Sequence, residues 1–501
     1  MGYLEPIESV EGRRRFRVLS PVDGHEVGTF AVSTAADVKA AVAKARAAQP
    51  AWDATPVRER VAVVLRAVEI LRKNADAYSD RMYAETGRAG LDTLMIELFA
   101  ALDSMNFYAR NAERVLADKT PGMHLLRMKK ARIAYRPLGV VGVISPWNGP
   151  FILSLNPSVQ ALLAGNTVLI KPSEVTPFSG QLVAELFAEA GLPDGVLQVL
   201  LGDGETGGAL LDAGLDKIAF TGSVRTGRKV GEACGRNLIP CTLELGGKDA
   251  MVVCADADLE RAAGGGVFGA MMNAGQFCSS TERVYVEAPV AEEFIAKVVS
   301  KVKELQIGRD IGPFISSAQV AIVEAHVQDA VAKGAKVLAG GQREGNAFQA
   351  TVLVDVTHDM DVMTEETFGP VIPIMVVKDL EEGIRMANDS QFGLGASVWT
   401  KDKAKGDRIA RRLIAGAVMV NESSMTYGAL EMPFGGRKAS GVGRVNGADA
   451  LQNWCHALPI ITDRFGSKEE AVWYPYTPEK TQKLRKALDV IWGTPLRLFI
   501  K

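Results

Sequence analysis

Residues 139–148 read Gly-Val-Val-Gly-Val-Ile-Ser-Pro-Trp-Asn, and this stretch decides the fold class. The run from Gly139 to Ile144 is apolar and rich in β-branched residues, which is typical of a strand buried on both faces in a parallel sheet. Ser145-Pro146-Trp147-Asn148 follows at the carboxyl end of the strand, where ligands of such sheets bind. The stretch therefore predicts an α/β protein with Asn148 pointing outward from a central strand.

The chain beyond this stretch alternates predicted strands with predicted helices. The strands are expected at residues 139–144, 167–170, 196–200, 217–220, 250–254 and 283–287. Lys171 and Gly222, like Asn148, come just past a strand. This pattern predicts a doubly wound region that binds a ligand at the carboxyl edge of its sheet.

A cysteine lies in an unusual setting at residues 273–280, which read Asn-Ala-Gly-Gln-Phe-Cys-Ser-Ser. Gly275 before Cys278 and two serines after it leave room for a ligand to approach the sulfur, whereas a structural cysteine usually lies among apolar residues. The setting favours a nucleophile. A small buried side chain at the end of a helix is the alternative interpretation.

Two polar residues can complete a catalytic set with Cys278. Glu244 lies between two leucines and precedes paired glycines, a setting that can raise the pKa of a general base; a salt-bridged glutamate at a strand end fits equally well. The Asn148 amide can donate hydrogen bonds to an oxyanion, or it can be a simple turn residue. Together the three residues predict attack on a carbonyl, stabilisation of the tetrahedral oxygen and activation of a water molecule.

In their order and separation, these three segments resemble the NAD(P)-dependent aldehyde dehydrogenase superfamily. The resemblance extends from about Ser20 to Trp454 and includes Lys171-Pro172-Ser173-Glu174, Phe220-Thr221-Gly222-Ser223, Glu366-Thr367-Phe368-Gly369-Pro370 and Pro433-Phe434-Gly435-Gly436. It implies a Rossmann-type cofactor domain, an α/β catalytic domain and a small β element for oligomerisation. The expected ranges are 1–118 and 139–245 for the cofactor domain, 246–437 for the catalytic domain, 119–138 and 453–470 for the oligomerisation element, and 471–501 for a tail with an amphipathic helix.

The resemblance also implies roles for individual residues. Cys278 is the nucleophile, Glu244 activates the hydrolytic water, and Asn148 with the Cys278 backbone amide holds the oxyanion. The implied cofactor-binding residues are Trp147, Lys171, Ser173, Glu174, Gly204, Phe220, Gly222, Ser223, Gly227, Leu245, Glu366 and Phe368. NAD is expected to be preferred over NADP, because Glu174 matches the position where relatives contact the adenosine ribose hydroxyls and would repel a 2′-phosphate.

Two glycine patterns need a separate interpretation. Residues 202–207 match G-x-G-x-x-G after a predicted strand, but no ribose-binding acid ends a strand about 20 residues later. By resemblance, the cofactor phosphates lie instead at the helix that follows Gly222-Ser223, near Gly227. Gly222 to Gly227 also approaches a P-loop, but Arg228-Lys229 replaces Lys-Ser/Thr, which argues against a nucleotide triphosphatase.

Composition limits the class of protein. The 501 residues, 47% of them hydrophobic, predict two or three domains, and a formal net charge of −2 gives no overall attraction for nucleic acid or an anionic membrane. Five cysteines without zinc-ligand spacing predict a reducing compartment and no metal. Without a secretory signal or an apolar segment of about 20 residues, the protein is expected to be cytoplasmic.

Three functions remain open from the sequence: a hydrolytic dehydrogenase, a CoA-acylating relative, and a non-catalytic protein on the same fold. Glu244 favours hydrolysis, because an acylating enzyme has little use for a water-activating base. The substrate is expected to be a small-molecule aldehyde. Trp147, Phe277, Met425 and Tyr427 can form an apolar pocket for it, and no arginine cluster lies near Cys278 in the sequence.

The protein is expected to form a homodimer or homotetramer. Residues 126–136 are basic with alternating apolar positions and resemble the protruding oligomerisation hairpin of the family. Further along, Thr477-Pro478-Glu479 begins a predicted amphipathic helix with apolar residues such as Leu484 and Leu488 on one face and basic residues largely elsewhere. Subunit packing is the favoured role of this helix, and contact with a membrane surface is the alternative.

Three other helices are interpreted as packing elements. Thr34 and Asp37 form a capping pair for the first, which the pattern ends at Pro50. Thr55 is the expected N-cap of the second, with Pro56 in its first turn. The third helix contains three consecutive glycines at 264–266, which are costly in a helix and indicate close packing.

Overall fold

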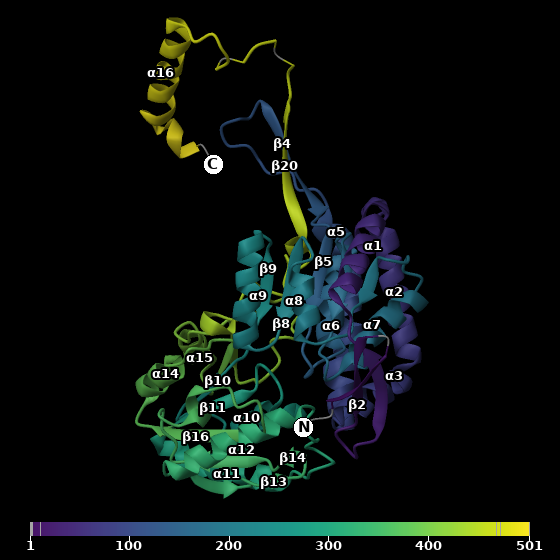
Figure 1. Cartoon of the computed structure of the whole chain (residues 1–501). Helices are drawn as coiled ribbons and strands as arrows, with labels where there is room; N and C mark the ends of the chain where they lie inside the picture. The colour runs from purple at the N-terminus through teal and green to yellow at the C-terminus, as the bar shows by residue number, and fades with distance from the viewer. Residues whose placement is uncertain (1–3, 11, 467, 471, 500–501) are drawn as a thin grey trace.

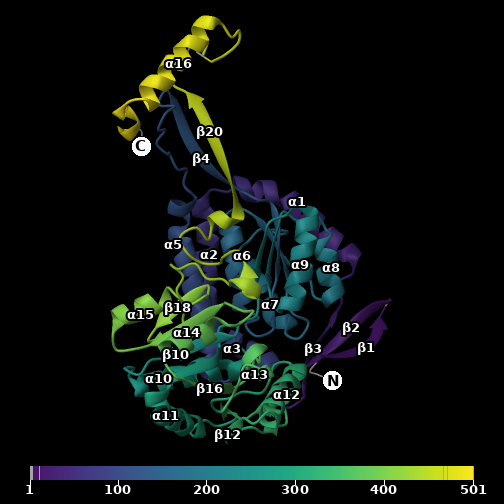
Figure 2. The same cartoon turned by 90° about the vertical axis from the view of Figure 1, so that its left-hand side faces the viewer.

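The computed structural model describes residues 4–10, 12–466, 468–470 and 472–499. The protein has two mainly parallel sheets, each with helices on both faces, and a two-stranded arm that projects away from them (Figures 1 and 2). The predicted α/β class is therefore confirmed.

The first sheet has six strands in the order β19-β9-β8-β5-β6-β7. The strands are β5 (Val140–Ile144), β6 (Thr167–Lys171), β7 (Leu197–Val199), β8 (Lys217–Thr221), β9 (Cys241–Glu244) and β19 (Gly441–Val442). Strands β5 to β9 are parallel, and β19 is an antiparallel edge strand. Because β5 lies between β6 and β8, the winding of the chain reverses at β5, and ligands of such sheets bind at the carboxyl ends beside this reversal.

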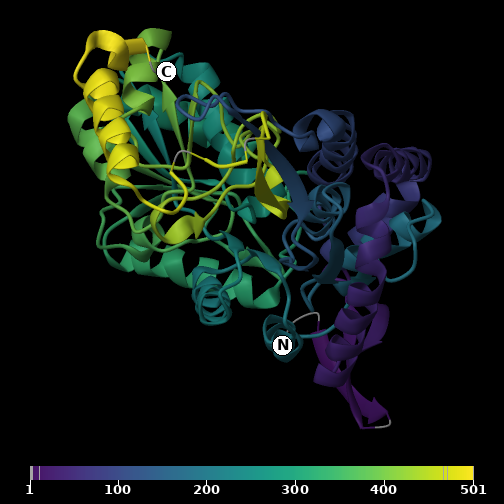
Figure 3. The same cartoon turned by 90° about the horizontal axis from the view of Figure 1, so that it is seen from above.

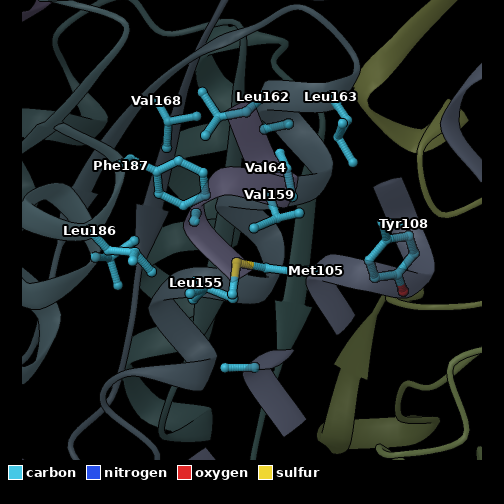
Figure 4. Packing of buried hydrophobic residues seen from close by; sticks show 14 of the residues in the cluster. Val64, Met105, Tyr108, Leu155, Val159, Leu162, Leu163, Val168, Leu186 and Phe187 are labelled. Atoms are coloured by element: carbon cyan, nitrogen blue, oxygen red, sulfur yellow. The ribbon is translucent and has the colours of Figure 1, made fainter. Parts of the chain in front are cut away.

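Helices cover both faces of the first sheet. They are α1 (Ala35–Ala54), α2 (Val57–Lys73), α3 (Ala75–Thr86), α5 (Ala100–Leu116), α6 (Ile152–Leu163), α7 (Pro177–Glu189), α8 (Gly204–Leu211) and α9 (Val224–Asn237). Val141 and Val143 of β5 face a core formed with α2, α5, α6 and α7 (Figure 4), while Val140 and Ile144 face a core formed with α1, α8 and α9. A strand buried on both faces must be apolar at every position, which explains the pattern of residues 139–144.

Helix α1 passes through Pro50, so the prediction that it ends there is wrong. Trp52 in the following turn is buried, and its indole N–H donates to the Leu162 carbonyl at 3.1 Å, which holds this turn against α6 despite the donor lost at Pro50. Thr55 caps the end of α1, and the predicted N-cap role belongs to Pro56. The capping box of Thr34 and Asp37 is confirmed.

The second sheet has seven strands in the order β12-β15-β16-β11-β10-β17-β18. The strands are β10 (Asp249–Val253), β11 (Thr281–Glu287), β12 (Lys336–Ala339), β15 (Thr351–Val354), β16 (Val371–Val377), β17 (Gly395–Trp399) and β18 (Ala417–Val420). Its helices are α10 (Leu259–Met271) and α11 (Ala291–Lys303) on one face, and α12 (Ser317–Ala332), α14 (Leu380–Asn388) and α15 (Lys403–Ala410) on the other. A Cβ at Gly265 of α10 would lie 2.2 Å from the Trp399 indole, so the predicted close packing is confirmed at this glycine, whereas a Cβ at Gly264 would meet nothing within 4 Å.

Smaller elements connect these layers. They are β1 (Leu4–Val10), β2 (Arg13–Leu19), β3 (Glu26–Ala31), α4 (Gly90–Asp92), the π-helix η1 (Thr93–Phe99), the 3-10 helices η2 (Met272–Gly275), η3 (Ala288–Val290), η4 (Lys438–Ser440) and η5 (Gln452–Trp454), β13 (Arg343–Glu344), β14 (Ala347–Phe348) and α13 (Asp361–Thr364).

The projecting arm pairs β4 (Lys129–Pro137) with β20 (Cys455–Asp463) in antiparallel register. After β20 the chain forms α16 (Pro478–Trp492), capped by Thr477 as predicted, and η6 (Pro495–Phe499). Seen from above, α16 lies toward the side that carries the second sheet (Figure 3), and it buries none of its side chains in this chain. The domain limits and the role of the arm in assembly stay predictions. Within the described residues, no helix combines the length and the apolar character needed to cross a membrane.

Candidate active site

The parallel strands β9, β8 and β5 end side by side and position most of the predicted site. Glu244 ends β9, Gly222 and Ser223 follow β8, and Asn148 follows β5. Cys278 comes from the loop between η2 and β11. A pocket of about 280 Å³ lies where these segments meet. The predicted residues that line it are Trp147, Asn148, Gly222, Ser223, Glu244, Leu245, Cys278, Glu366 and Phe368.

The other predicted residues lie outside this lining. Phe220 lines a smaller cavity that also contains Glu244 and Cys278. Gly227 lies in the first turns of α9, where a Cβ would come within 2.3 Å of Leu245, so this glycine lets α9 pack against the leucine that follows Glu244.

The remaining four residues lie at the end of β6 or after β6 and β7. The Lys171 Nζ donates to the Glu174 carboxylate at 3.0 Å, and Ser173 lies between them in the sequence. Gly204 begins α8, which Asp203 caps. The structure does not bring Gly204 to the pocket, and its implied contact with the cofactor stays a prediction.

The loop that carries Cys278 turns through left-handed backbone. Asn273, Ala274 and Gly275 have φ values of 54°, 55° and 72°. A Cβ at Gly275 would lie 2.1 Å from the Gly369 carbonyl group. The sequence interpretation of Gly275 therefore needs correction, because this glycine makes room for the backbone of residues 369–370 and not for a ligand.

A buried arginine that the sequence reasoning missed ties this loop to Asn148. The Arg88 guanidinium pairs with Glu97 at 2.9 Å, donates to the Asn273 side chain at 2.8 Å, and donates to the Asn148 backbone carbonyl. The Asn148 side-chain amide in turn donates to the Gln276 carbonyl at 3.2 Å. One signal was available, because Glu97 interrupts the apolar run of residues 94–99 and a lone carboxylate there is costly to bury.

A second buried pair, also missed, holds the segment that carries Glu366 and Phe368. Lys248 pairs with Glu282 at 2.6 Å, and the Glu282 carboxylate accepts the backbone N–H groups of Thr367 and Phe368, both at 2.8 Å. Phe368 has a left-handed φ of 52°, and its ring meets Trp147 edge to face at 5.4 Å. These contacts fix one wall of the pocket.

The Glu244 carboxylate is buried but lines the pocket. Neither of its oxygens has a hydrogen-bond partner in the described protein. Burial raises its pKa well above the usual value, and the opposing effect of Arg444 is smaller. An unpaired carboxylate with a raised pKa has the properties of a general base.

Cys278 is partly exposed to solvent and lies near several carboxylates. Burial of the thiol raises its pKa above the ordinary value, and the charges of Asp249, Glu244 and Glu366 raise it further, while the Ser279 backbone N–H lowers it. Burial also raises the pKa of Glu366 to about 8. The resting thiol is therefore protonated near neutral pH and needs a base or a bound positive charge to become a thiolate.

A small cavity connects Glu244 to Cys278. Its volume is about 30 Å³, and Glu244 and Cys278 both line it together with Asn156, Thr242 and Tyr427. This volume is sufficient for a water molecule, and the polar side chains can supply its hydrogen bonds. The arrangement can place water between the carboxylate and the sulfur.

The pocket fits a dinucleotide cofactor. It extends from Cys278 to Gly222 and Ser223, where the 14-residue helix α9 begins. The Ser223 side chain accepts the Thr226 N–H, and the backbone amides before Thr226 lie at a helix N-terminus, which suits a diphosphate. Arg225 and Arg228 in its first turns are exposed and add positive charge. Among the described residues, no group of three or more His, Cys, Asp or Glu side chains is arranged to hold a metal ion.

Comparisons with known proteins identify the family. The model of the aldehyde dehydrogenase family matches residues 7–458. The chain belongs to this family. As an NAD(P)-dependent aldehyde dehydrogenase, it oxidises an aldehyde to a carboxylic acid, and the predicted resemblance is confirmed.

Several relatives of this aldehyde dehydrogenase are similar over almost their whole length. A Methylomonas protein named 4,4′-diapolycopene aldehyde oxidase is 42% identical over 95% of this chain and 91% of its own. A Mycolicibacterium smegmatis protein, named as a candidate NADP(+)-dependent succinate-semialdehyde dehydrogenase, is 42% identical over 92% of this chain and 91% of its own. The structure of Mycobacterium tuberculosis aldehyde dehydrogenase complexed with NAD+ is 37% identical, with a TM-score of 0.86 over 90% of this chain and 95% of that one.

The raised pKa of Glu244 predicts that Glu244→Gln stabilises this dehydrogenase at high pH. The folded state holds the Glu244 proton more tightly than the unfolded state, so the stability from this carboxyl group is complete below its unfolded pKa and is lost as pH rises through its folded pKa. We expect the variant to gain about 1–3 kcal/mol in free energy of unfolding near pH 8, the usual cost of an unpaired buried polar group.

Denaturant unfolding from about pH 5 to pH 8 measures this gain, which should shrink toward the acid end. Glu304→Gln, at an exposed position, is the matched control and should show no such trend. A Glu244→Gln variant less stable than the wild type at pH 8 would show that this carboxylate is paired in the folded protein.

Proposed function

We propose that the enzyme works through a covalent acyl intermediate on Cys278, which water activated by Glu244 then hydrolyses. One observation carries the proposal: the unpaired Glu244 carboxylate lines two of the three cavities that Cys278 lines. Transfer of the acyl group to CoA would not need such a base, so the structure favours hydrolysis over the acylating alternative.

The first half of the reaction forms a bond between the Cys278 sulfur and the carbonyl carbon. The thiol gives its proton to solvent water, the resulting thiolate attacks the carbonyl carbon, and the carbonyl oxygen becomes an oxyanion in a thiohemiacetal. The Asn148 amide and the Cys278 backbone N–H are the proposed donors to this oxygen, and the Arg88 network holds Asn148 in place. When bound, the oxidised nicotinamide accepts the hydride that leaves the thiohemiacetal carbon.

The second half regenerates the enzyme. Loss of the hydride leaves a thioester on Cys278, and water in the small cavity attacks its carbonyl carbon. Glu244 accepts the proton of this water, the carbon–sulfur bond breaks, and the acid leaves while the sulfur departs as a thiolate. Both properties of Glu244, its lack of a partner and its raised pKa, suit this step.

We also propose NAD as the preferred cofactor. The Glu174 carboxylate is partly exposed beyond the end of β6, where it would accept hydrogen bonds from ribose hydroxyls and repel a 2′-phosphate. The ion pair with Lys171 reduces this repulsion, which leaves NADP as an alternative. The names of the relatives include both cofactors.

We also propose that the enzyme is a cytoplasmic homo-oligomer. A homodimer or homotetramer built through the β4–β20 arm would cover exposed apolar residues such as Leu458 and Ile461 of β20. The five free cysteines support a reducing, cytoplasmic location.

The mechanism predicts different defects for two variants. Cys278→Ala should abolish aldehyde oxidation while cofactor binding survives, because only the sulfur is lost. Glu244→Gln should give a burst of NADH followed by a steady state slower by about 100-fold or more, since an amide cannot accept the proton of water. Stopped-flow absorbance at the NADH band measures both phases.

Cys241→Ser is the control for the first variant, because Cys241 begins β9 at the end away from the pocket and should keep normal turnover. Substantial turnover by Cys278→Ala would refute the nucleophile. Turnover of wild-type enzyme that requires CoA would establish the acylating alternative instead.

The cofactor proposal predicts a higher kcat/KM for NAD than for NADP in the wild type. Glu174→Ser should shift this ratio toward NADP by about tenfold, the effect expected for removal of one nearby negative charge. Glu189→Ser, exposed on the following helix α7, is the control for loss of charge alone. A wild type that prefers NADP, or a ratio that Glu174→Ser leaves unchanged, contradicts the role of Glu174.

A further inference from the structure

A second pocket, separate from the one that fits the cofactor, also ends at Cys278 and Asn148. Its volume is about 230 Å³. Its walls come from the π-helix η1, the starts of α5 and α6, helix α10 and the loop at residues 424–428. Because it reaches the nucleophile and the oxyanion donor, this pocket is the place for the body of the aldehyde.

The walls of this pocket are apolar. Large contributions come from Ile96, Phe99, Phe268, Met272, Phe277 and Met425. Of the residues expected to form the substrate pocket, Phe277, Met425 and Tyr427 line this cavity, whereas Trp147 lines the pocket assigned to the cofactor. Aromatic and thioether side chains pack against hydrocarbon chains of many shapes.

The mouth of the pocket is apolar as well. Phe99, Phe268 and Met425 line the pocket and are also 70%, 40% and 54% exposed. An apolar surface therefore continues from Cys278 to the outside of the protein. A hydrocarbon chain too long for the pocket can remain in contact with this rim.

The charges around the pocket disfavour a second carboxylate on the substrate. Of the described residues that line it, none is arginine, lysine or histidine. Among the same residues, Asp103 on α5 is the one acidic side chain. Burial raises the pKa of Asp103, and Glu431 raises it further. The buried Arg88 is not available, because its guanidinium nitrogens already donate to Glu97, Asn273 and Asn148.

We infer that the substrate is an aldehyde with an uncharged, extended hydrocarbon body, and that an aldehyde with a carboxylate at its far end is a poor substrate. This inference rests on the proposed function at Cys278. A terminal carboxylate would lose its hydration in an apolar pocket, find no cationic partner there, and face the like charge of Asp103.

A matched pair of aldehydes tests the inference in the wild-type enzyme. Hexanal and 6-oxohexanoate have the same chain length and differ in the terminal carboxylate. We expect kcat/KM for hexanal to exceed that for 6-oxohexanoate by about 100-fold. From butanal to decanal, we expect kcat/KM to rise by about two- to fourfold for each added methylene that the walls cover.

Asp103→Asn measures the repulsion between Asp103 and the substrate carboxylate separately from the cost of dehydrating that carboxylate. It should raise the ratio of kcat/KM for 6-oxohexanoate to that for hexanal by about three- to tenfold at about pH 8, as expected for one nearby charge. Glu113→Gln, exposed near the end of the same helix α5, should leave this ratio unchanged.

The outcomes separate the inference from the mechanism. Turnover of both aldehydes with 6-oxohexanoate equal or preferred overturns the inference and leaves the proposed function intact. A flat dependence on chain length likewise overturns it. No NADH from any of these aldehydes, with folded enzyme and bound cofactor, refutes the proposed function instead.

Discussion

The active site depends on the buried guanidinium of Arg88, which joins three segments that are far apart in the sequence. It pairs with Glu97 of η1, holds the Asn148 backbone after β5, and binds the Asn273 side chain in the loop before Cys278. Removal of one partner from such a pair costs about 3–5 kcal/mol, because a buried charge is left unpaired. In the proposed mechanism the oxyanion donor Asn148 and Cys278 are therefore fixed relative to each other before a substrate arrives, so their ordering adds no cost in the transition state.

Buried charges in this protein fall into two kinds. Arg88 and Lys248 are paired and satisfied, and each helps to hold a loop of the site that contains left-handed backbone, at Asn273 and at Phe368 respectively. Glu244 is buried without a partner, and its pKa is raised for that reason. The paired charges give the site its rigidity, whereas the unpaired carboxylate costs stability and supplies basicity. In the proposed mechanism, this difference separates the residues that position the site from the residue that moves a proton.

The sequence predicted the parts of this site that have a local signal. The strand at residues 139–144 is apolar throughout because both of its faces are buried, and Glu244 is conspicuous between leucines. The Arg88 network has no such signal, since its partners lie up to 185 residues away and only the fold brings them together. Gly275 was misinterpreted for the same reason, because the backbone that fills its space belongs to residues 369–370. Helix α1 continues past Pro50 because a tertiary contact of Trp52 outweighs a local stop signal.

The central claim is that an acyl group passes through Cys278 and leaves by hydrolysis at Glu244. The most direct test is peptide mass spectrometry of Glu244→Gln quenched in acid during turnover of decanal with NAD. The account predicts a decanoyl thioester on the peptide that contains Cys278, at an occupancy far above that in the wild type. An absent adduct despite NADH formation, or an adduct on one of the other four cysteines, would contradict it.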